Sequence, residues 1–373
     1  MVELLDETEE KALETLKNTC QLKKKNITKE NGHVVSIHIY NKEITNLSGS
    51  IGDLKLLNSL SLTSCGLKSL PESIGNLKSL EEFKLAGNQL TRLPESIGDL
   101  TSLKVLWIHD NQLIEIPESF GNLKLLEELW FQSNKLKSLP ESFGGLEALQ
   151  DLTLTGNQLK SLPKSFGKLK SLKILRLSNN QLTHLPESFK KLEVLHTLSL
   201  GDNQFAYFPE QVIEIKTLKS LYFGGNQLTT LPESIGGLES LKELYLENNK
   251  LITLPESIQD LKSLKELNLR NNKLKSLPES FGNLESINTL DLNHNELTSL
   301  PNSLGNLKLL GKLSIYGNQL KSLPESLRGL NNLHYINLGN NPLTEKAKKF
   351  YNELDEKAKE LERLMDRIIA DIK

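Results

Sequence analysis

The sequence predicts an α/β solenoid: stacked units that form a horseshoe, with a parallel sheet on the concave face and short helical or 3₁₀ segments on the convex face. An asparagine recurs every 23 residues, leucines recur at fixed offsets from it, and a proline holds one position in each unit. A constant interval of this length is typical of stacked solenoids. The asparagines are Asn88, Asn111, Asn134, Asn157, Asn180, Asn203, Asn226, Asn249, Asn272, Asn295, Asn318 and Asn341.

The asparagine position is predicted to form a buried polar ladder. Counting the period backwards reaches Cys65 and then Lys42, so fourteen units can be counted. In each unit a short alternating stretch such as Leu60-Ser61-Leu62 predicts a strand with one buried face. An Asn amide can then satisfy the backbone groups of the turn that follows. Cys65, in the same slot, is interpreted as structural rather than catalytic.

The proline predicts where the outer segment begins. Its fixed φ and missing N–H suit the first residue of a short helix. A glycine four residues after the proline, as in Pro71 and Gly75, is predicted to end that turn early, so the outer segments should be short or 3₁₀. The prolines are Pro71, Pro94, Pro117, Pro140, Pro163, Pro186, Pro209, Pro232, Pro255, Pro278, Pro301 and Pro324.

The repeated motif resembles that of a known family. The pattern LxxLxLxxNxL is met by the stretch from Leu80 to Leu90, and its extension LPxSIGxLxxL by Leu93 to Leu103. Both resemble the leucine-rich-repeat family, in particular the 23-residue class of Ras-group intracellular scaffolds, over residues 34–343. The resemblance implies a binding module that holds signalling proteins. Lys42 and Cys65 depart from the pattern, as does Ile213, which replaces the glycine.

The two ends differ from the repeats, which divides the chain into residues 1–33, 34–343 and 344–373. Residues 3–18, with Leu5 among their apolar positions, predict a short amphipathic helix. Asn31-Gly32 predicts a hairpin whose strand covers the first edge of the sheet. A helix is predicted from Thr344 to about residue 371. Its later apolar stripe either folds back over the solenoid end or pairs with another helix, self or foreign: Leu361, Leu364, Met365, Ile368 and Ile369.

Composition and motifs narrow the function classes. The formal charge is −2, which gives no bulk attraction to nucleic acid or anionic lipid. The two cysteines form no disulfide framework, and we find no secretory signal or membrane-length apolar run, so a cytoplasmic protein is expected. Neither a phosphate-binding glycine loop nor a metal or nucleophile motif is found. We therefore expect no enzymatic activity, no cofactor and no metal.

The candidate site lies on the inner face of the sheet. The residue between the two strand leucines points away from the core, and both tryptophans, Trp107 and Trp130, hold this position in consecutive units. Adjacent strands are about 4.8 Å apart, so the indoles are predicted to stack. The predicted contact residues around them are Glu82, Lys84, His109, Glu128 and Arg176. A second patch comprises Tyr222, Tyr245, Glu243, Glu247 and Arg270, beside small residues that would leave room for a partner: Gly201, Gly224 and Gly225.

The charge of this face favours one class of partner. Its four inner columns hold four basic residues, Lys84, Arg176, Arg270 and Lys312, and nine acidic ones, Glu82, Asp110, Glu128, Asp151, Asp202, Glu243, Glu247, Glu266 and Asp291. A phosphate backbone would be repelled, whereas a protein or peptide with basic and apolar groups fits. We expect a largely monomeric protein-interaction scaffold in signalling. The alternatives are a regulator or inhibitor of an enzyme such as a GTPase or phosphatase, and tryptophans that only shield the sheet backbone.

Overall fold

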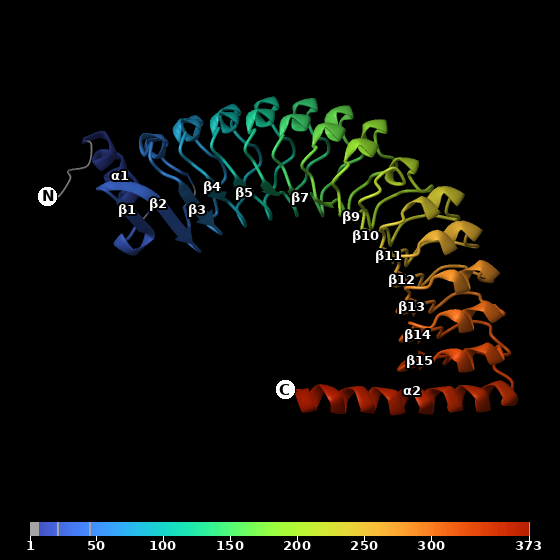
Figure 1. Ribbon diagram of the computed structural model, residues 1–373. Helices are drawn as coiled ribbons and strands as arrows, with labels where there is room; N and C mark the ends of the chain where they lie inside the picture. The colour runs from blue at the N-terminus through green and yellow to red at the C-terminus, as the bar shows by residue number, and fades with distance from the viewer. Residues whose placement is uncertain (1–6, 21, 45, 373) are drawn as a thin grey trace. The chain divides into compact units, whose positions relative to one another are not determined.

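The computed structural model describes residues 7–20, 22–44 and 46–372. The chain forms two compact units, Met1–Leu195 and His196–Lys373, and each is described by itself. Figure 1 labels the elements along the chain. The first unit contains α1 (Glu7–Cys20), η1 (Lys24–Asn26), β1 (Ile27–Glu30), β2 (His33–Tyr40), η2 (Gly49–Asp53), β3 (Ser59–Thr63), η3 (Glu72–Asn76), β4 (Glu82–Lys84), η4 (Glu95–Asp99), β5 (Val105–Trp107), η5 (Glu118–Asn122), β6 (Glu128–Trp130), η6 (Glu141–Gly145), β7 (Asp151–Thr153), η7 (Lys164–Lys168), β8 (Ile174–Arg176) and η8 (Glu187–Lys191).

The second unit repeats the same alternation and ends in a long helix. It contains β9 (Thr197–Ser199), η9 (Glu210–Val212), β10 (Ser220–Tyr222), η10 (Glu233–Gly237), β11 (Glu243–Tyr245), η11 (Glu256–Asp260), β12 (Glu266–Asn268), η12 (Glu279–Asn283), β13 (Thr289–Asp291), η13 (Asn302–Asn306), β14 (Lys312–Ser314), η14 (Glu325–Gly329), β15 (Tyr335–Asn337) and α2 (Glu345–Ile372). The η elements are 3₁₀ helices.

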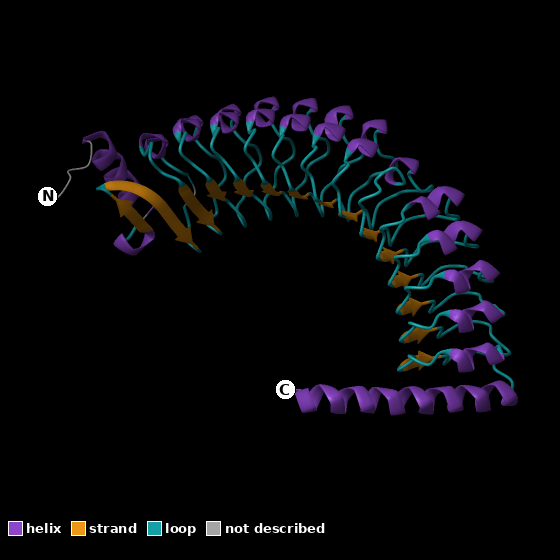
Figure 2. Cartoon of the chain, in the orientation of Figure 1, coloured by secondary structure: helices purple, strands orange, loops and turns teal. Residues whose placement is uncertain are grey.

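Within each unit the strands pair in chain order. In the first unit β1 is antiparallel to β2, and the pairs from β2 to β8 are parallel. In the second unit the pairs from β9 to β15 are parallel. Residues 23 apart in the sequence occupy neighbouring positions in register, as Trp107 in β5 and Trp130 in β6 do. Strands and 3₁₀ helices line opposite faces of each unit, which confirms the predicted solenoid (Figure 2).

The proline precedes its 3₁₀ helix, so the prediction that it is the first helical residue is wrong. Pro71 has φ −74° and ψ 151°, and η3 begins at the next residue. The Pro71 carbonyl accepts the N–H of Ile74, which closes the first turn. The ring therefore fixes an extended residue that turns the chain into the helix.

The recurring glycine also has a different role from the predicted one. Gly98 lies inside η4 rather than ending it. A Cβ on Gly98 would lie 2.1 Å from the carbonyl oxygen of Ser119 in the next repeat. The glycine is needed because neighbouring 3₁₀ helices approach closely, not because the turn must stop. Where Ile213 replaces it, the 3₁₀ helix spans only Glu210–Val212.

The asparagines form the predicted ladder beneath the strands. Asn111 donates from Nδ2 to the carbonyls of Leu85 (2.9 Å) and Ile108 (3.1 Å), and its Oδ1 accepts the N–H of Leu90 (3.0 Å). Each asparagine therefore joins its own repeat to the preceding one. Cys65 holds the first slot of this pattern, where its Sγ donates to the carbonyls of Ile39 and Thr63.

Leucines, isoleucines and phenylalanines from every repeat form the core between the two faces of each unit. All eleven phenylalanines of the chain are buried. Four of them stack along consecutive repeats of the first unit with ring centroids 6.1–6.3 Å apart: Phe120, Phe143, Phe166 and Phe189. The apolar aromatics thus strengthen the core, while the polar aromatics lie elsewhere.

Both predicted end elements are present. Asn31 (φ 50°) and Gly32 (φ 84°) form the hairpin turn, and β1 covers the edge of β2. The buried carboxylate of Glu9, in α1, accepts the N–H of Val34 at 2.6 Å and lies 2.8 Å from Nδ1 of His33, which ties α1 to the hairpin. The predicted helix residue Leu5 lies outside the described residues. At the other end, α2 begins directly after Thr344, as predicted.

Candidate binding surface

The strand face, the side of the sheet opposite the leucine core, carries both predicted patches, one in each unit. In the first unit Trp107 and Trp130 are the last residues of β5 and β6 and are paired in register. The leucine before each indole is fully buried, so alternation directs the indole away from the core. The tryptophan cluster consists of these two residues with Glu82, Lys84 and Glu128.

Stacking and polar contacts hold the tryptophan cluster in place. The two indoles are parallel within 6°, with ring centroids 4.6 Å apart. Nε1 of Trp107 donates to Oε1 of Glu128 at 2.8 Å. Nζ of Lys84 lies 4.3 Å from the Trp107 ring centre and 3.1 Å from Oε2 of Glu82. The result is a rigid, half-buried aromatic platform with a cation on one side.

The second indole lacks the hydrogen bond that the first one has. Nε1 of Trp130 is buried and has no hydrogen-bond partner. The residue that corresponds to Glu128 is Asp151, whose Oδ1 accepts from Nη1 of Arg176 at 2.9 Å. Burial raises the pKa of Asp151, and the Arg176 charge offsets only part of that rise. Arg176 is therefore engaged within the strand face.

His109 belongs to the edge of this platform. Its ring centre lies 6.1 Å from that of Trp130, at a 48° tilt. Its Nδ1 lies 2.7 Å from Oδ2 of Asp110, which follows it in the chain. The side chain thus lies beside the platform rather than on it.

In the second unit the tyrosine cluster comprises Tyr222, Tyr245, Glu243, Glu247 and Glu266. The phenol rings stack with centroids 4.7 Å apart and a 9° angle. The hydroxyl of Tyr222 donates to Glu243 at 3.0 Å, and that of Tyr245 to Glu266 at 2.6 Å. Burial, then these carboxylates, raise the pKa of both phenols, so each hydroxyl stays protonated as a donor.

One carboxylate oxygen near these tyrosines lacks a hydrogen-bond partner. Oε2 of Glu247 is buried without a hydrogen bond, and burial, then Asp202 and Asp291, raise the pKa of this carboxyl. The expectation that Gly224 and Gly225 leave room for a partner is wrong. A Cβ on Gly224 would lie 2.5 Å from Glu247, and one on Gly225 would lie 2.1 Å from Asp202. Carboxylates fill that space.

Arg270, the basic residue predicted in the tyrosine patch, forms no polar contact with the tyrosines in the described chain. It follows β12 and is exposed, and among the described residues its side chain has no hydrogen bond or ion pair. Sequence reasoning missed a relation between residues 21 apart. An aromatic residue at one position donates to a glutamate 21 residues later, as in Trp107 and Glu128 or Tyr245 and Glu266. That spacing is readable in the sequence.

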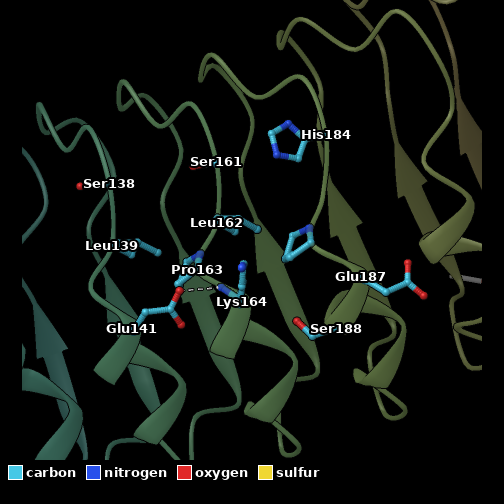
Figure 3. A pocket seen from close by; sticks show the side chains of 11 residues that line it. Ser138, Leu139, Glu141, Ser161, Leu162, Pro163, Lys164, His184, Glu187 and Ser188 are labelled. Atoms are coloured by element: carbon cyan, nitrogen blue, oxygen red, sulfur yellow. Dashed lines mark hydrogen bonds between the residues drawn. The ribbon is translucent and has the colours of Figure 1, made fainter.

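A cleft on the flank of the first unit is a product of the repeat geometry. It measures about 590 Å³ and is lined by Leu139, Glu141, Lys164, His184 and their neighbours (Figure 3). The Glu141 carboxylate accepts the N–H groups of Lys164 and Ser165, each at 3.0 Å, and these bonds lower its pKa. A cleft of similar size recurs between Ser69 and Pro117. Neither cleft contains a predicted site residue.

The described part of the chain shows neither a metal-binding group nor a membrane-spanning helix. Over residues 7–20, 22–44 and 46–372, no group of three or more His, Cys, Asp or Glu side chains is placed to hold a metal ion. None of the helices described is both long and apolar enough to cross a bilayer. Cys20 and Cys65 are free and buried.

Comparison with known proteins identifies the class. A model of the leucine-rich repeat region matches residues 12–135, 165–267 and 244–369, and a leucine-rich repeat model matches residues 116–159. The chain therefore belongs to the leucine-rich-repeat family. No curated protein matches the sequence.

Solved structures agree with this assignment. The LRR protein LIC12759 of Leptospira interrogans is 34% identical with a TM-score of 0.69, over 86% of this chain and 94% of that one. An internalin (inlF) of Listeria monocytogenes shares the fold at 21% identity and a TM-score of 0.71, over 90% and 96%. The LRR ectodomain of the plant membrane receptor kinase GASSHO1/SCHENGEN3 from Arabidopsis thaliana, solved in complex with CASPARIAN STRIP INTEGRITY FACTOR 2, is 26% identical with a TM-score of 0.50, over 87% and 50%.

These matches define the protein at the level of its class. Leucine-rich-repeat proteins are in general binding modules without enzymatic activity, and their ligands are proteins or peptides. The chain is thus a repeat protein of the protein-interaction type.

Proposed function

We propose that this chain is a non-enzymatic cytoplasmic scaffold for signalling that binds a partner protein on its strand face. The observation that carries the proposal is the tryptophan cluster. Two stacked, half-buried indoles on an open sheet face form a large, preorganised contact surface. Rigid aromatic residues with a polar atom are the side chains that most often dominate the energy of protein interfaces.

The charge of the strand face supports a partner with basic and apolar groups. In the tyrosine cluster, Glu243 and Glu266 accept the phenol hydrogen bonds and form no ion pair within the described chain. In the tryptophan cluster, Lys84 is already paired with Glu82. A cationic group of the partner would therefore meet unneutralised carboxylates chiefly beside the tyrosines. The free, buried cysteines support a reducing compartment.

Affinity capture followed by titration tests the proposal. Trp107→Ala combined with Trp130→Ala should weaken binding of the captured partner at least tenfold, about 1.4 kcal/mol or more, with nearly the same thermal midpoint. Lys160→Ala, on an exposed residue away from the strands, serves as the control. Equal binding by the double variant and the control contradicts the proposal. If a captured enzyme changes activity on binding, the protein is instead its regulator.

A further inference from the structure

The apolar stripe of α2 continues past the part of the helix that covers the last repeat. Apolar residues recur at alternating intervals of four and three, the spacing of a seam between two helices. The first four are Ala347, Tyr351, Leu354 and Ala358, and the same register continues through Leu361, Met365 and Ile368. One seam therefore runs through both halves of α2.

The two halves of this seam differ in what covers them. Ala347, Leu354 and Ala358 are 5%, 5% and 2% exposed, because this half packs on β15. Arg328 holds the same half through an ion pair with Glu353 at 2.9 Å. Figure 1 shows α2 extending beyond the edge of β15.

Past Ala358 the apolar side chains have no cover. Leu364, Met365 and Ile368 are 50%, 41% and 53% exposed, and Leu361 is partly exposed. The predicted alternative in which this stripe folds back over the solenoid end is wrong for these residues. Ile369, also predicted in the stripe, lies outside the described side chains. We name Leu361, Leu364, Met365 and Ile368 the exposed seam.

Charges beside the exposed seam point to one occupant. Glu360 and Arg367 are seven residues apart, so they share one flank of the helix, with Leu364 between them. They line a groove of about 560 Å³ together with Leu364. Neither forms an ion pair within the described chain, whereas nearby Lys359 pairs with Asp355 and Glu356. Arg363 also lines this groove and forms no ion pair within the described chain, so the flank offers one free carboxylate and two free guanidinium groups.

We propose that the exposed seam pairs with the same segment of a second copy of this chain, with the two helices antiparallel and a twofold axis near Leu364. In this arrangement Leu364 meets its own counterpart, and Leu361 meets Ile368 of the second copy. Glu360 then faces Arg367 of the second copy, and the symmetry forms this ion pair twice. Apolar residues meet apolar ones and, on the flank that carries Glu360 and Arg367, each of these two charges meets its opposite, so this side of the segment is complementary to itself.

The size of the surface sets the strength of the pairing. The exposed seam is about two helical turns, roughly 11 Å long. It is much smaller than the about 1,600 Å² of a typical stable interface, so the dimer belongs to the weak, transient class. Dimers should form only at high protein concentration, and the strand face of each copy takes no part in the pairing.

Charge exchange tests the pairing. Sedimentation equilibrium of the full chain, from about 1 µM to about 500 µM, should show a mass that rises towards the dimer. Glu360→Arg alone and Arg367→Glu alone should each raise the dimer dissociation constant at least tenfold, because each places like charges together. An equimolar mixture of these two variants should recover the dimer, because one chain then carries a positive charge at both positions and the other carries a negative charge at both. Helical circular dichroism checks that α2 remains folded.

Asp366→Arg is the matched control. It makes the same change in charge as Glu360→Arg but lies on the opposite side of α2, so self-association should be unchanged. A wild-type mass that stays monomeric at every concentration overturns the proposal, and is the result expected if a foreign helix is the natural occupant. A mixture of the two single variants that fails to associate more than either one alone overturns the antiparallel arrangement.

Discussion

Replacing one ladder asparagine tests how the repeats are held together. Oδ1 of Asn157 accepts the N–H of Leu136, and its Nδ2 donates to the carbonyls of Phe131 and Leu154, all at 3.0 Å. Asn157→Ala leaves the buried N–H of Leu136 without an acceptor, whereas the two carbonyls lose one donor each and keep Asn134 and Asn180 as their other donors. At about 1–3 kcal/mol for the unpaired N–H and about 1 kcal/mol for each of the two lost bonds, the free energy of unfolding should fall by about 4 kcal/mol.

Urea unfolding followed by circular dichroism measures the loss, with Lys160→Ala, exposed in the same repeat, as the control. Asn157→Cys should lose less than Asn157→Ala, because Cys65 shows that a thiol in this slot can still donate to backbone carbonyls. If Asn157→Ala unfolds within about 0.5 kcal/mol of the control, the ladder does not stabilise the stack as its hydrogen bonds imply.

Three further predictions rest on packing and titration. Gly121→Ala places a Cβ 2.2 Å from a carbonyl oxygen of the next repeat, so it should lower the free energy of unfolding by about 2 kcal/mol, measured by thermal unfolding. Gly49→Ala is the control, because the nearest atom to its added Cβ is 3.5 Å away, and it should lower the stability little. Equal losses in the two variants would contradict the close approach of neighbouring 3₁₀ helices. Burial, then neighbouring aspartates, raise the pKa of Glu247, so the folded state favours the protonated carboxyl. The free energy of unfolding should therefore fall as the pH rises from the ordinary carboxyl pKa to the higher pKa of the folded state. Glu247→Gln should raise the thermal unfolding midpoint at pH 7 but not at pH 3, and a lower midpoint at pH 7 would refute this. Burial raises the pKa of Cys20 and Cys65, which are 0% exposed, so a thiol reagent should modify them only after denaturation; rapid labelling of the native protein would count against it.

The repeat period specified most of the fold in advance. The strand, the ladder and the outer 3₁₀ helix follow from local patterns that recur in every repeat. The structure predicted for one repeat therefore holds for the others. The proline precedes the helix instead of beginning it, and the role of the glycine depends on contacts with the next repeat. Pro71 is extended before its helix, and Gly98 allows a neighbouring carbonyl to approach. Such contacts leave no trace within a single unit of sequence.

The candidate site was predictable in its aromatic residues but not in its polar contacts. Alternation placed Trp107 and Trp130 on one face, and the strand spacing predicted their stacking. The sequence could not show that Arg176 takes Asp151 and leaves the Trp130 N–H without an acceptor. That outcome depends on competition between two donors for one short carboxylate, which only the three-dimensional arrangement decides.

The asparagine ladder has a direction, and this affects how the chain can change length. The ladder amides bond to the repeat before their own, as Asn111 does to Leu85 and Leu90. Duplicating a whole internal unit therefore adds a closed set of bonds and breaks none. Cys65 occupies the ladder position before the first asparagine, and its thiol needs fewer hydrogen-bond partners than an amide does. This position therefore loses few hydrogen bonds although no ladder asparagine precedes it. Inserting or deleting a whole 23-residue repeat therefore breaks few ladder hydrogen bonds, whereas an insertion or deletion of any other length shifts the asparagines out of register.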